Sequence, residues 1–226
     1  MKYETQILRE VHSVLLPLKN HTRALGAQAY MKDIAPFIGI SAPDRRAATK
    51  PIFNALPPQN SDELGRAAKL LYAQQMREYS YAANDLLAQY ISLADKDFLK
   101  GTIADLIQKV SWWDTVDGLG SAAVSPLARK YPSRTLMKGW IKHPDIWVNR
   151  AAIGHQRGWK GETEVDFVLW LCHQKACETE FFIAKAIGWA LRDITAFDKP
   201  SVRRFLADHP GLNRVAVREA ERGLHR

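Results

Sequence analysis

Ala152-Ile153-Gly154 recurs 34 residues later as Ala186-Ile187-Gly188, and this repeated stretch decides the expected fold. Shorter related words follow the same spacing, with central residues at positions 82, 117, 150, 185 and 218. Near-constant spacing of this length is typical of stacked helix pairs, and the chain shows no useful period-two alternation of the kind that strands require. The sequence therefore predicts an all-α protein built as a helical-repeat solenoid.

The kind of repeat is indicated by the words that are missing. The chain has neither the Leu-Gly-x-x-Tyr motif of tetratricopeptide repeats nor the Thr-Pro-Leu-His motif of ankyrin repeats. Short HEAT-like helix pairs remain, although typical HEAT units are longer. We expect residues 1–226 to form a single HEAT-like repeat domain with a concave basic groove.

Helix boundaries are indicated by caps and by punctuating residues. Apolar residues at helical spacing predict one helix over residues 5–18 and another over about 22–34, which includes Tyr30. Ser41 and Asn60 are the expected N-caps of later helices, and Pro43 lies in the first turn after Ser41. Helical patterns of about 10–15 residues, separated by short breaks, then continue to the C-terminus.

The composition is that of a folded protein with a basic surface. The chain has 226 residues, with 32 Lys and Arg against 24 Asp and Glu, and a formal net charge of +8. This balance is compatible with a polyanionic partner. No apolar leader or membrane-spanning stretch is recognisable, and two cysteines cannot form a disulfide framework. We expect a soluble cytoplasmic protein with no membrane partner.

Several common chemistries lack their motifs. Cys172 and Cys177 do not have the spacing of a zinc site, and no second ligand pair follows them. The chain has no nucleophile elbow and no glycine-rich loop for phosphates or dinucleotides. The sequence therefore predicts neither a metal nor a cofactor.

The stretch Ser111-Trp112-Trp113-Asp114-Thr115-Val116-Asp117-Gly118 concentrates indoles and carboxylates. Ser111 followed three residues later by Asp114 resembles a capping box, which predicts a helix with Ser111 as its N-cap. On that helix Trp113 and Asp117 share one face. Asp114 is then expected to stabilise the helix N-terminus, whereas Asp117 gains little from capping. Asp117 is the candidate for chemistry on, or near, a cation.

The repeat spacing aligns this carboxylate with three cations. If the alignment holds, Asp117, Arg150, Lys185 and Arg218 project from corresponding positions of neighbouring inner helices. Trp189 follows Lys185 by four residues and is expected, like Trp113, to leave the core. One reading is a groove for a polyanion with a single carboxylate in its middle; the other is a row of solvated surface charges.

The chain resembles the DNA alkylation repair enzyme family, the AlkD-type bacterial glycosylases built from HEAT-like repeats. The resemblance runs from about Ala29 to Arg218. It is carried by five words in order: Ala29-Tyr30-Met31-Lys32; Phe37-Ile38-Gly39-Ile40 with Pro43-Asp44-Arg45-Arg46; Ser111 to Asp117; Trp147-Val148-Asn149-Arg150-Ala151-Ala152-Ile153; and Phe181 to Arg192.

The resemblance implies excision of cationic alkylated purines, chiefly N3-methyladenine and N7-methylguanine, from duplex DNA without base flipping. Asp117 would be the catalytic carboxylate, and Trp113 and Trp189 would pack against the deoxyribose of the lesion. Arg150 would hold the backbone phosphate near the lesion, and Tyr30 would line the same groove. Gly118 and Gly120 stand where family members often carry bulkier residues.

Two functions from different classes stay open at this point. The first is a monofunctional glycosylase in base excision repair that binds alkylated double-stranded DNA as a monomer, with Lys185, Arg192 and Arg218 adding phosphate contacts. The second is a non-catalytic HEAT-like module that binds unusual DNA structures or a protein partner. The pairing of Trp113 with Asp117 favours the enzyme, because a groove for phosphates has no use for a carboxylate.

Overall fold

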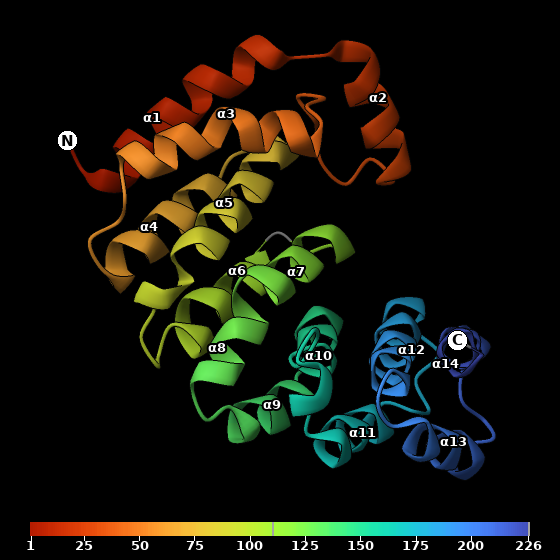
Figure 1. Ribbon diagram of the computed structural model, residues 1–226. Coiled ribbons are helices and arrows are strands. Elements are labelled where there is room, and N and C mark those ends of the chain that lie inside the picture. Colours follow the sequence, from red (N-terminus) through yellow and green to blue (C-terminus); the bar gives the residue numbers. More distant parts are fainter. Residues whose placement is uncertain (110, 226) are drawn as a thin grey trace. The chain divides into compact units, whose positions relative to one another are not determined.

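A computed structural model describes residues 1–109 and 111–225, and these form helices with no strand among them (Figure 1). The prediction of an all-α protein is confirmed. The chain divides into two compact units, Met1–Leu106 and Ile107–Arg226. The prediction of a single domain stays a prediction.

The first unit is formed mainly by four helices, α1, α3, α4 and α5, that pack on one another. The element bounds in this part of the chain are α1 Tyr3–Leu15, η1 Leu16–Leu18, α2 His21–Tyr30, α3 Ala42–Ala55, α4 Ser61–Tyr72, α5 Arg77–Tyr90, η2 Ile91–Leu93 and η3 Leu99–Ile103. Helix α6, Ala104–Lys109, contains the boundary between the two units.

Two of the expected N-caps are present in this unit. The Ser41 hydroxyl accepts a hydrogen bond from the backbone N–H of Asp44 over 3.2 Å, and the Asn60 side chain accepts one from Glu63 over 3.0 Å. These bonds satisfy N–H groups that a helix start leaves unpaired. Helix α2 ends at Tyr30, earlier than expected, because the chain turns after it with Lys32 and Asp33 at φ values of 61° and 57°.

The segment before α3 is held against α5 by one buried carboxylate. Glu78 is 1% exposed and accepts three backbone N–H bonds, from Ile38, Gly39 and Ile40, over 2.9, 2.7 and 3.2 Å. Gly39 has a φ of 91°, and a Cβ on it would lie 2.1 Å from the carbonyl oxygen of Asn20. Only glycine fits this backbone position.

The second unit stacks its helices in two layers (Figure 1). Helices α7, α10, α12 and α14 form one layer, in which each packs on the next, and α9, α11 and α13 form the other. The bounds are α7 Trp113–Leu119, η4 Gly120–Val124, α8 Ser125–Lys130, α9 Arg134–Trp140, α10 Ile146–Ile153, η5 Lys160–Glu162, α11 Val165–Gln174, α12 Phe181–Thr195, α13 Lys199–Asp208 and α14 Arg214–Leu224. This is the stacking of helix pairs that the 34-residue spacing predicts.

Helices α12 and α14 approach each other through small residues. A Cβ on Gly188 would lie 2.7 Å from the Cβ of Glu219 and 3.0 Å from backbone atoms of Ala216. A Cβ on Gly223 would lie 2.1 Å from the Thr195 hydroxyl. This close packing fixes α12, which carries several residues of the candidate site.

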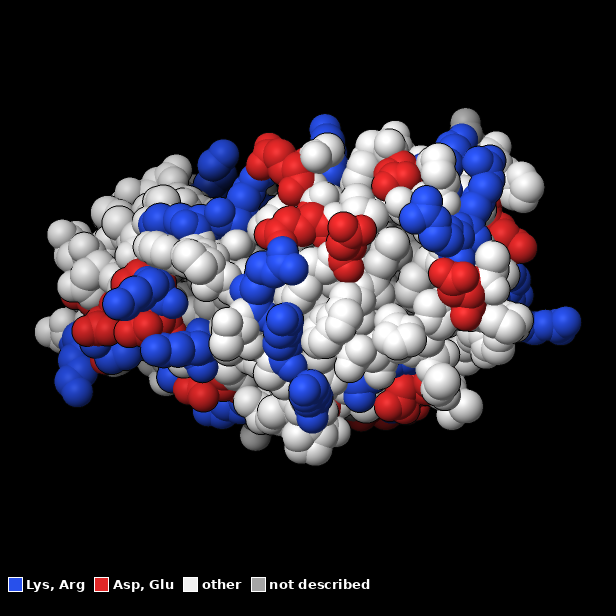
Figure 2. Space-filling view, turned by 90° about the horizontal axis from the view of Figure 1, so that it is seen from below, with Lys and Arg blue, Asp and Glu red and all other residues white. Residues whose placement is uncertain are grey.

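Charged side chains of both signs are interleaved on the face shown in Figure 2. The excess of basic residues is therefore spread among acidic ones on this face. Within the described part of the chain, no helix has the length and apolar character needed to cross a membrane.

Candidate functional site

Helix α7 begins differently from the capping box that the sequence predicted. Its N-cap residue is Trp112, whose side chain accepts no hydrogen bond from a backbone N–H of the helix. The Ser111 hydroxyl instead donates to the carbonyl of Ile107 over 2.7 Å. The prediction of Ser111 as N-cap is therefore wrong, because its hydroxyl is used by the end of the preceding helix. Asp114 still lies in the first turn of α7, and Asp117 lies one turn after Trp113.

Asp117 is held by a two-pronged ion pair across the helix layer. Arg150 on α10 donates from Nε to Asp117 Oδ1 and from Nη2 to Oδ2, each over 2.8 Å. Its Nη1 donates to the carbonyl of Phe182 on α12 over 2.6 Å. Planar fork-to-carboxylate pairing of this kind fixes direction as well as distance. The pair therefore orients the Asp117 carboxylate between three helices.

Arg150 occupies a different position from that of an exposed phosphate anchor. Only 4% of Arg150 is exposed, and three of its five N–H groups point at a carboxylate and a backbone carbonyl. The expected contact between Arg150 and a DNA phosphate stays a prediction, but the observed geometry is that of a residue that positions Asp117.

Trp189 on α12 packs against the Arg150 guanidinium. The Arg150 guanidinium carbon lies 4.9 Å from the centroid of the Trp189 ring, and that of Arg157 lies at the same distance. The Trp189 indole is half-buried. Trp112, Trp147 and Phe182 also pack together, with ring centroids 4.9 to 5.6 Å apart.

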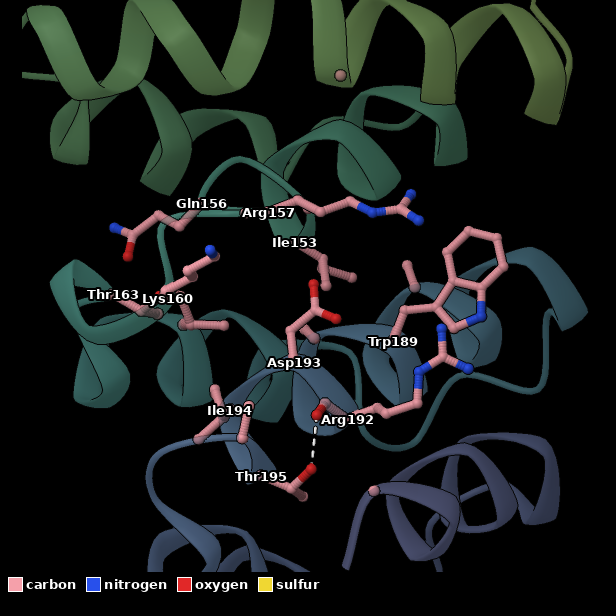
Figure 3. A pocket seen from close by; sticks show the side chains of 18 of the residues that line it. Ile153, Gln156, Arg157, Lys160, Thr163, Trp189, Arg192, Asp193, Ile194 and Thr195 are labelled. Atoms are coloured by element: carbon pink, nitrogen blue, oxygen red, sulfur yellow. Dashed lines mark hydrogen bonds between the residues drawn. The ribbon is translucent and has the colours of Figure 1, made fainter. Parts of the chain in front are cut away.

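A cavity of about 680 Å³ opens beside Asp117 and Trp189. Its wall includes Arg150, Arg157 and Asp193, together with apolar side chains of α10 and α12. In Figure 3 the Asp193 carboxylate points toward Ile153, and the Arg157 side chain extends toward Trp189. A volume of this size is within the range of small-molecule sites in proteins.

Asp193 is a second carboxylate of this cavity. Burial raises the pKa of Asp193, although the charges of Arg157 and Arg192 act in the opposite direction. The residue follows Trp189 by four positions on α12, so the two lie on one helix face.

Two of the expected DNA-binding cations are bound to a buried carboxylate. Lys185 and Arg192 on α12 contact Glu219 of α14 over 2.8 and 2.5 Å, and Arg222 joins them at 2.8 Å. Glu219 is 3% exposed; burial acts to raise its pKa, but the hydrogen bond from Lys185 and the three positive charges outweigh it and lower the pKa. The repeat spacing had placed Arg218 in line with Lys185. Arg218 directly precedes Glu219 in the sequence and is exposed.

The expectation of one carboxylate among three cations is therefore wrong. Glu219 and Asp193 are further carboxylates in the same unit, and Glu219 neutralises cations that were expected to face DNA. The sequence held a signal for this, because the 34-residue offset that relates Ala186 to Ala152 also places residue 219 against Lys185. The motif spacing used above predicts Arg218 at this position instead.

Other site predictions have different outcomes. Trp113 begins α7 and is half-buried, and it is not among the described residues that line the cavity. Tyr30 ends α2 in the first unit and is 71% exposed, so its place in the groove stays a prediction. No group of three or more His, Cys, Asp or Glu side chains able to hold a metal occurs in residues 1–109 and 111–225.

Arg157 and Asp193 were missed by the sequence reasoning. Asp193 could have been found from its four-residue spacing after Trp189. Arg157 lies outside a helix, between α10 and η5, so no helical spacing relates it to the other site residues.

Stacked helix pairs with an aspartate, an arginine and an indole at one cavity define a helical-repeat protein with a charged site. The family model for the DNA alkylation repair enzyme matches residues 11–224, and the chain belongs to this family. A solved structure of a predicted DNA alkylation repair enzyme from Enterococcus faecalis is similar over 90% of this chain and 95% of that one, with 29% identity and a TM-score of 0.83. None of the curated proteins matches.

Proposed function

We propose that the protein is a monofunctional DNA glycosylase of base excision repair. Its substrates would be cationic alkylated purines, N3-methyladenine and N7-methylguanine, in duplex DNA, which it would bind as a monomer, without a cofactor and without base flipping. Membership of the DNA alkylation repair enzyme family supports a repair role. The observation that carries the proposal is the Asp117 carboxylate, fixed by Arg150 at the wall of a cavity that Trp189 also lines.

The charge of the substrate explains why one carboxylate suffices. Alkylation at N3 or N7 makes the purine a cation, so breaking the bond between its nitrogen and C1′ releases a neutral base without protonation. Positive charge then develops on the sugar, as in glycoside hydrolysis. Asp117 would stabilise this charge and accept a proton from the water that bonds to C1′. The electron-rich faces of Trp189 and Trp113 would favour the same cation.

Arg150 has both a benefit and a cost in this arrangement. Its fork fixes the direction of the carboxylate, which reduces the reorganisation needed in the transition state. Its charge also offsets part of the negative charge of Asp117. Each Asp117 oxygen takes one of the two hydrogen bonds and retains acceptor capacity for water or sugar. Arg150 is therefore proposed here as a positioning residue.

The test is release of N7-methylguanine from methylated duplex DNA in single turnover. Asp117→Asn keeps the shape of the side chain but removes the charge, and we expect release to fall by at least about 100-fold. Asp114→Asn makes the same chemical change one turn earlier on α7 and should leave release nearly unchanged. Equal release by the Asp117→Asn variant and the intact protein would exclude the proposed role.

One observation favours a second function, that of a non-catalytic DNA-structure-binding module. Both Asp117 oxygens are engaged by Arg150, which resembles a structural ion pair. This alternative predicts salt-sensitive DNA binding by the intact protein, no base release, and little effect of Asp117→Asn on affinity. The same release assay separates the two functions.

A further inference from the structure

Among the described arginines that line the cavity, Arg157 is the one whose guanidinium forms no hydrogen bond or ion pair. It is exposed, and within residues 1–109 and 111–225 no carboxylate or carbonyl takes a hydrogen bond or ion pair from its side chain. Arg150 by contrast is bound to Asp117, and Arg192 to Glu219. A guanidinium with all five donors available is the group that proteins use to bind a phosphodiester through two oxygens.

The position of Arg157 is set by its backbone and by Trp189. Its carbonyl accepts a hydrogen bond of 2.9 Å from the Ser125 hydroxyl, which also takes a 2.9 Å bond from the indole of Trp159. These bonds fix the segment that carries Arg157 to α8. The guanidinium carbon then lies 4.9 Å from the Trp189 centroid, and Figure 3 shows the side chain extending toward that indole.

We propose that Arg157 is the phosphate-binding arginine of the site, and that it holds a DNA backbone phosphate beside the sugar that Trp189 contacts while Arg150 stays on Asp117. The inference rests on the proposed function for the identity of the DNA, but not on catalysis. The resemblance implies that Arg150 binds this phosphate, and the proposal assigns that contact to Arg157 instead. The buried Arg150 guanidinium, which is bound to a carboxylate, orients Asp117. The exposed and unpaired guanidinium of Arg157 binds the DNA backbone.

Asp193 sets the strength of this contact. It lines the cavity with Arg157, and the two charges interact. A phosphate on Arg157 would therefore be opposed by the neighbouring carboxylate. The proposal predicts opposite effects for the two residues: Arg157→Gln weakens DNA binding, and Asp193→Asn strengthens it at low salt.

The test is equilibrium binding of the full chain to two DNA duplexes, one undamaged and one with a tetrahydrofuran abasic analogue. Fluorescence anisotropy measures the binding at several salt concentrations. Loss of one phosphate contact reduces the slope of log affinity against log salt by about 0.9. We expect this change for Arg157→Gln, with about five- to tenfold weaker binding near 0.1 M salt, and recovery of the slope in Arg157→Lys. Asp193→Asn should bind at least about twofold more tightly.

Arg129→Gln is the matched control. Arg129 also lies over an indole, 6.0 Å from the Trp159 centroid, but it is exposed and paired with Glu162. Its removal should leave the slope unchanged. An unchanged slope in Arg157→Gln, or a loss of slope in Arg150→Gln alone, would overturn the proposal. Since binding is measured without base release, a protein that passes this test and releases no base would disprove only the glycosylase.

Discussion

At the residue scale, each unit contains a buried arginine paired with a half-buried aspartate. In the first unit Arg45 on α3 donates from Nε to Asp85 on α5 over 2.9 Å, and its guanidinium lies 5.2 Å from the Tyr81 ring. This arrangement resembles that of Arg150, Asp117 and Trp189. The Asp117 pair lies at the wall of the cavity, and the Arg45 pair is a comparison of similar geometry from the other unit.

The two pairs offer a matched experiment. Arg150→Lys keeps the charge but loses the fork, so we expect the free energy of unfolding to fall by about 2 kcal/mol and base release to slow by about tenfold. Arg45→Lys should cost similar stability and leave release unchanged. Urea denaturation and single-turnover release measure the two effects. Equal slowing of release in both variants would show that Arg150 has no special part in orienting Asp117.

His155 makes the stability of the fold sensitive to acid. It is 0% exposed, and its Nδ1 donates to the Ala152 carbonyl over 2.7 Å. Burial lowers its pKa from 6.5 to about 4. The unfolded chain therefore takes up the proton first as the pH falls, and the free energy of unfolding should decrease below pH 6.5 until about pH 4, by about 3 kcal/mol in total.

A substitution isolates this contribution. Asn at position 155 keeps a donor near Nδ1 and does not titrate, so His155→Asn should remove most of the decrease between pH 6.5 and 4. Urea denaturation at a series of pH values measures it. The same decrease in the variant would assign the acid sensitivity to other groups.

Helix α12 is the element on which the site depends. It supplies Trp189 and Asp193 to the cavity, the Phe182 carbonyl to Arg150, and Lys185 to Glu219. Its distance from α14 is set by glycines and alanines, because backbone and Cβ atoms meet there directly. A change in this spacing should move several site residues at once.

Gly188→Ala tests the packing of α12 on α14. The added Cβ would lie 2.7 Å from the Cβ of Glu219 and 3.0 Å from backbone atoms of Ala216, which cannot move aside as a flexible side chain could. We expect a loss of about 1–3 kcal/mol of stability, measured by urea denaturation. Gly139→Ala on α9 meets nothing within 4 Å and should be neutral or stabilising by up to about 1 kcal/mol. Unchanged stability in Gly188→Ala would mean that the two helices separate readily.

At the scale of the whole molecule, positive charge is in excess, but basic residues are not separated from acidic ones on the face shown in Figure 2. The net charge is +8, and Figure 2 shows acidic side chains among the basic ones. Ion pairs with carboxylates neutralise part of the positive charge, for example that of Arg150 and Arg192. The sequence-independent affinity for DNA should therefore depend on the Lys and Arg side chains that form no ion pair.

The unpaired Lys and Arg side chains should also bind undamaged DNA. Binding should be independent of sequence, within about threefold for two unrelated duplexes, because phosphate contacts carry no sequence information. If four phosphates are contacted, affinity should fall on the order of 100-fold between 50 and 200 mM salt. Fluorescence anisotropy measures both. Absence of binding at low salt would favour a protein-interaction scaffold.

The helical-repeat fold was predictable from the sequence because its signals are local or periodic. The match of Ala152-Ile153-Gly154 to Ala186-Ile187-Gly188 reports the repeat, and the side chains of Ser41 and Asn60 begin helices within three residues of themselves. Asp117 and Trp189 were also recognisable, from their words and their spacing. Each of these inferences needs only neighbouring residues or a regular period.

The partners of the charges were decided by the tertiary structure alone. A helix turns by about 100° per residue, so an alignment error of one position redirects a side chain by more than a quarter turn. For this reason the spacing suggested Arg218 beside Lys185, whereas Glu219 is there and binds it. The sequence determined which helices form and where a carboxylate and an indole stand on them. Only the packing of α7, α10 and α12 determined that Arg150 turns inward to Asp117 and that Arg157 stays exposed.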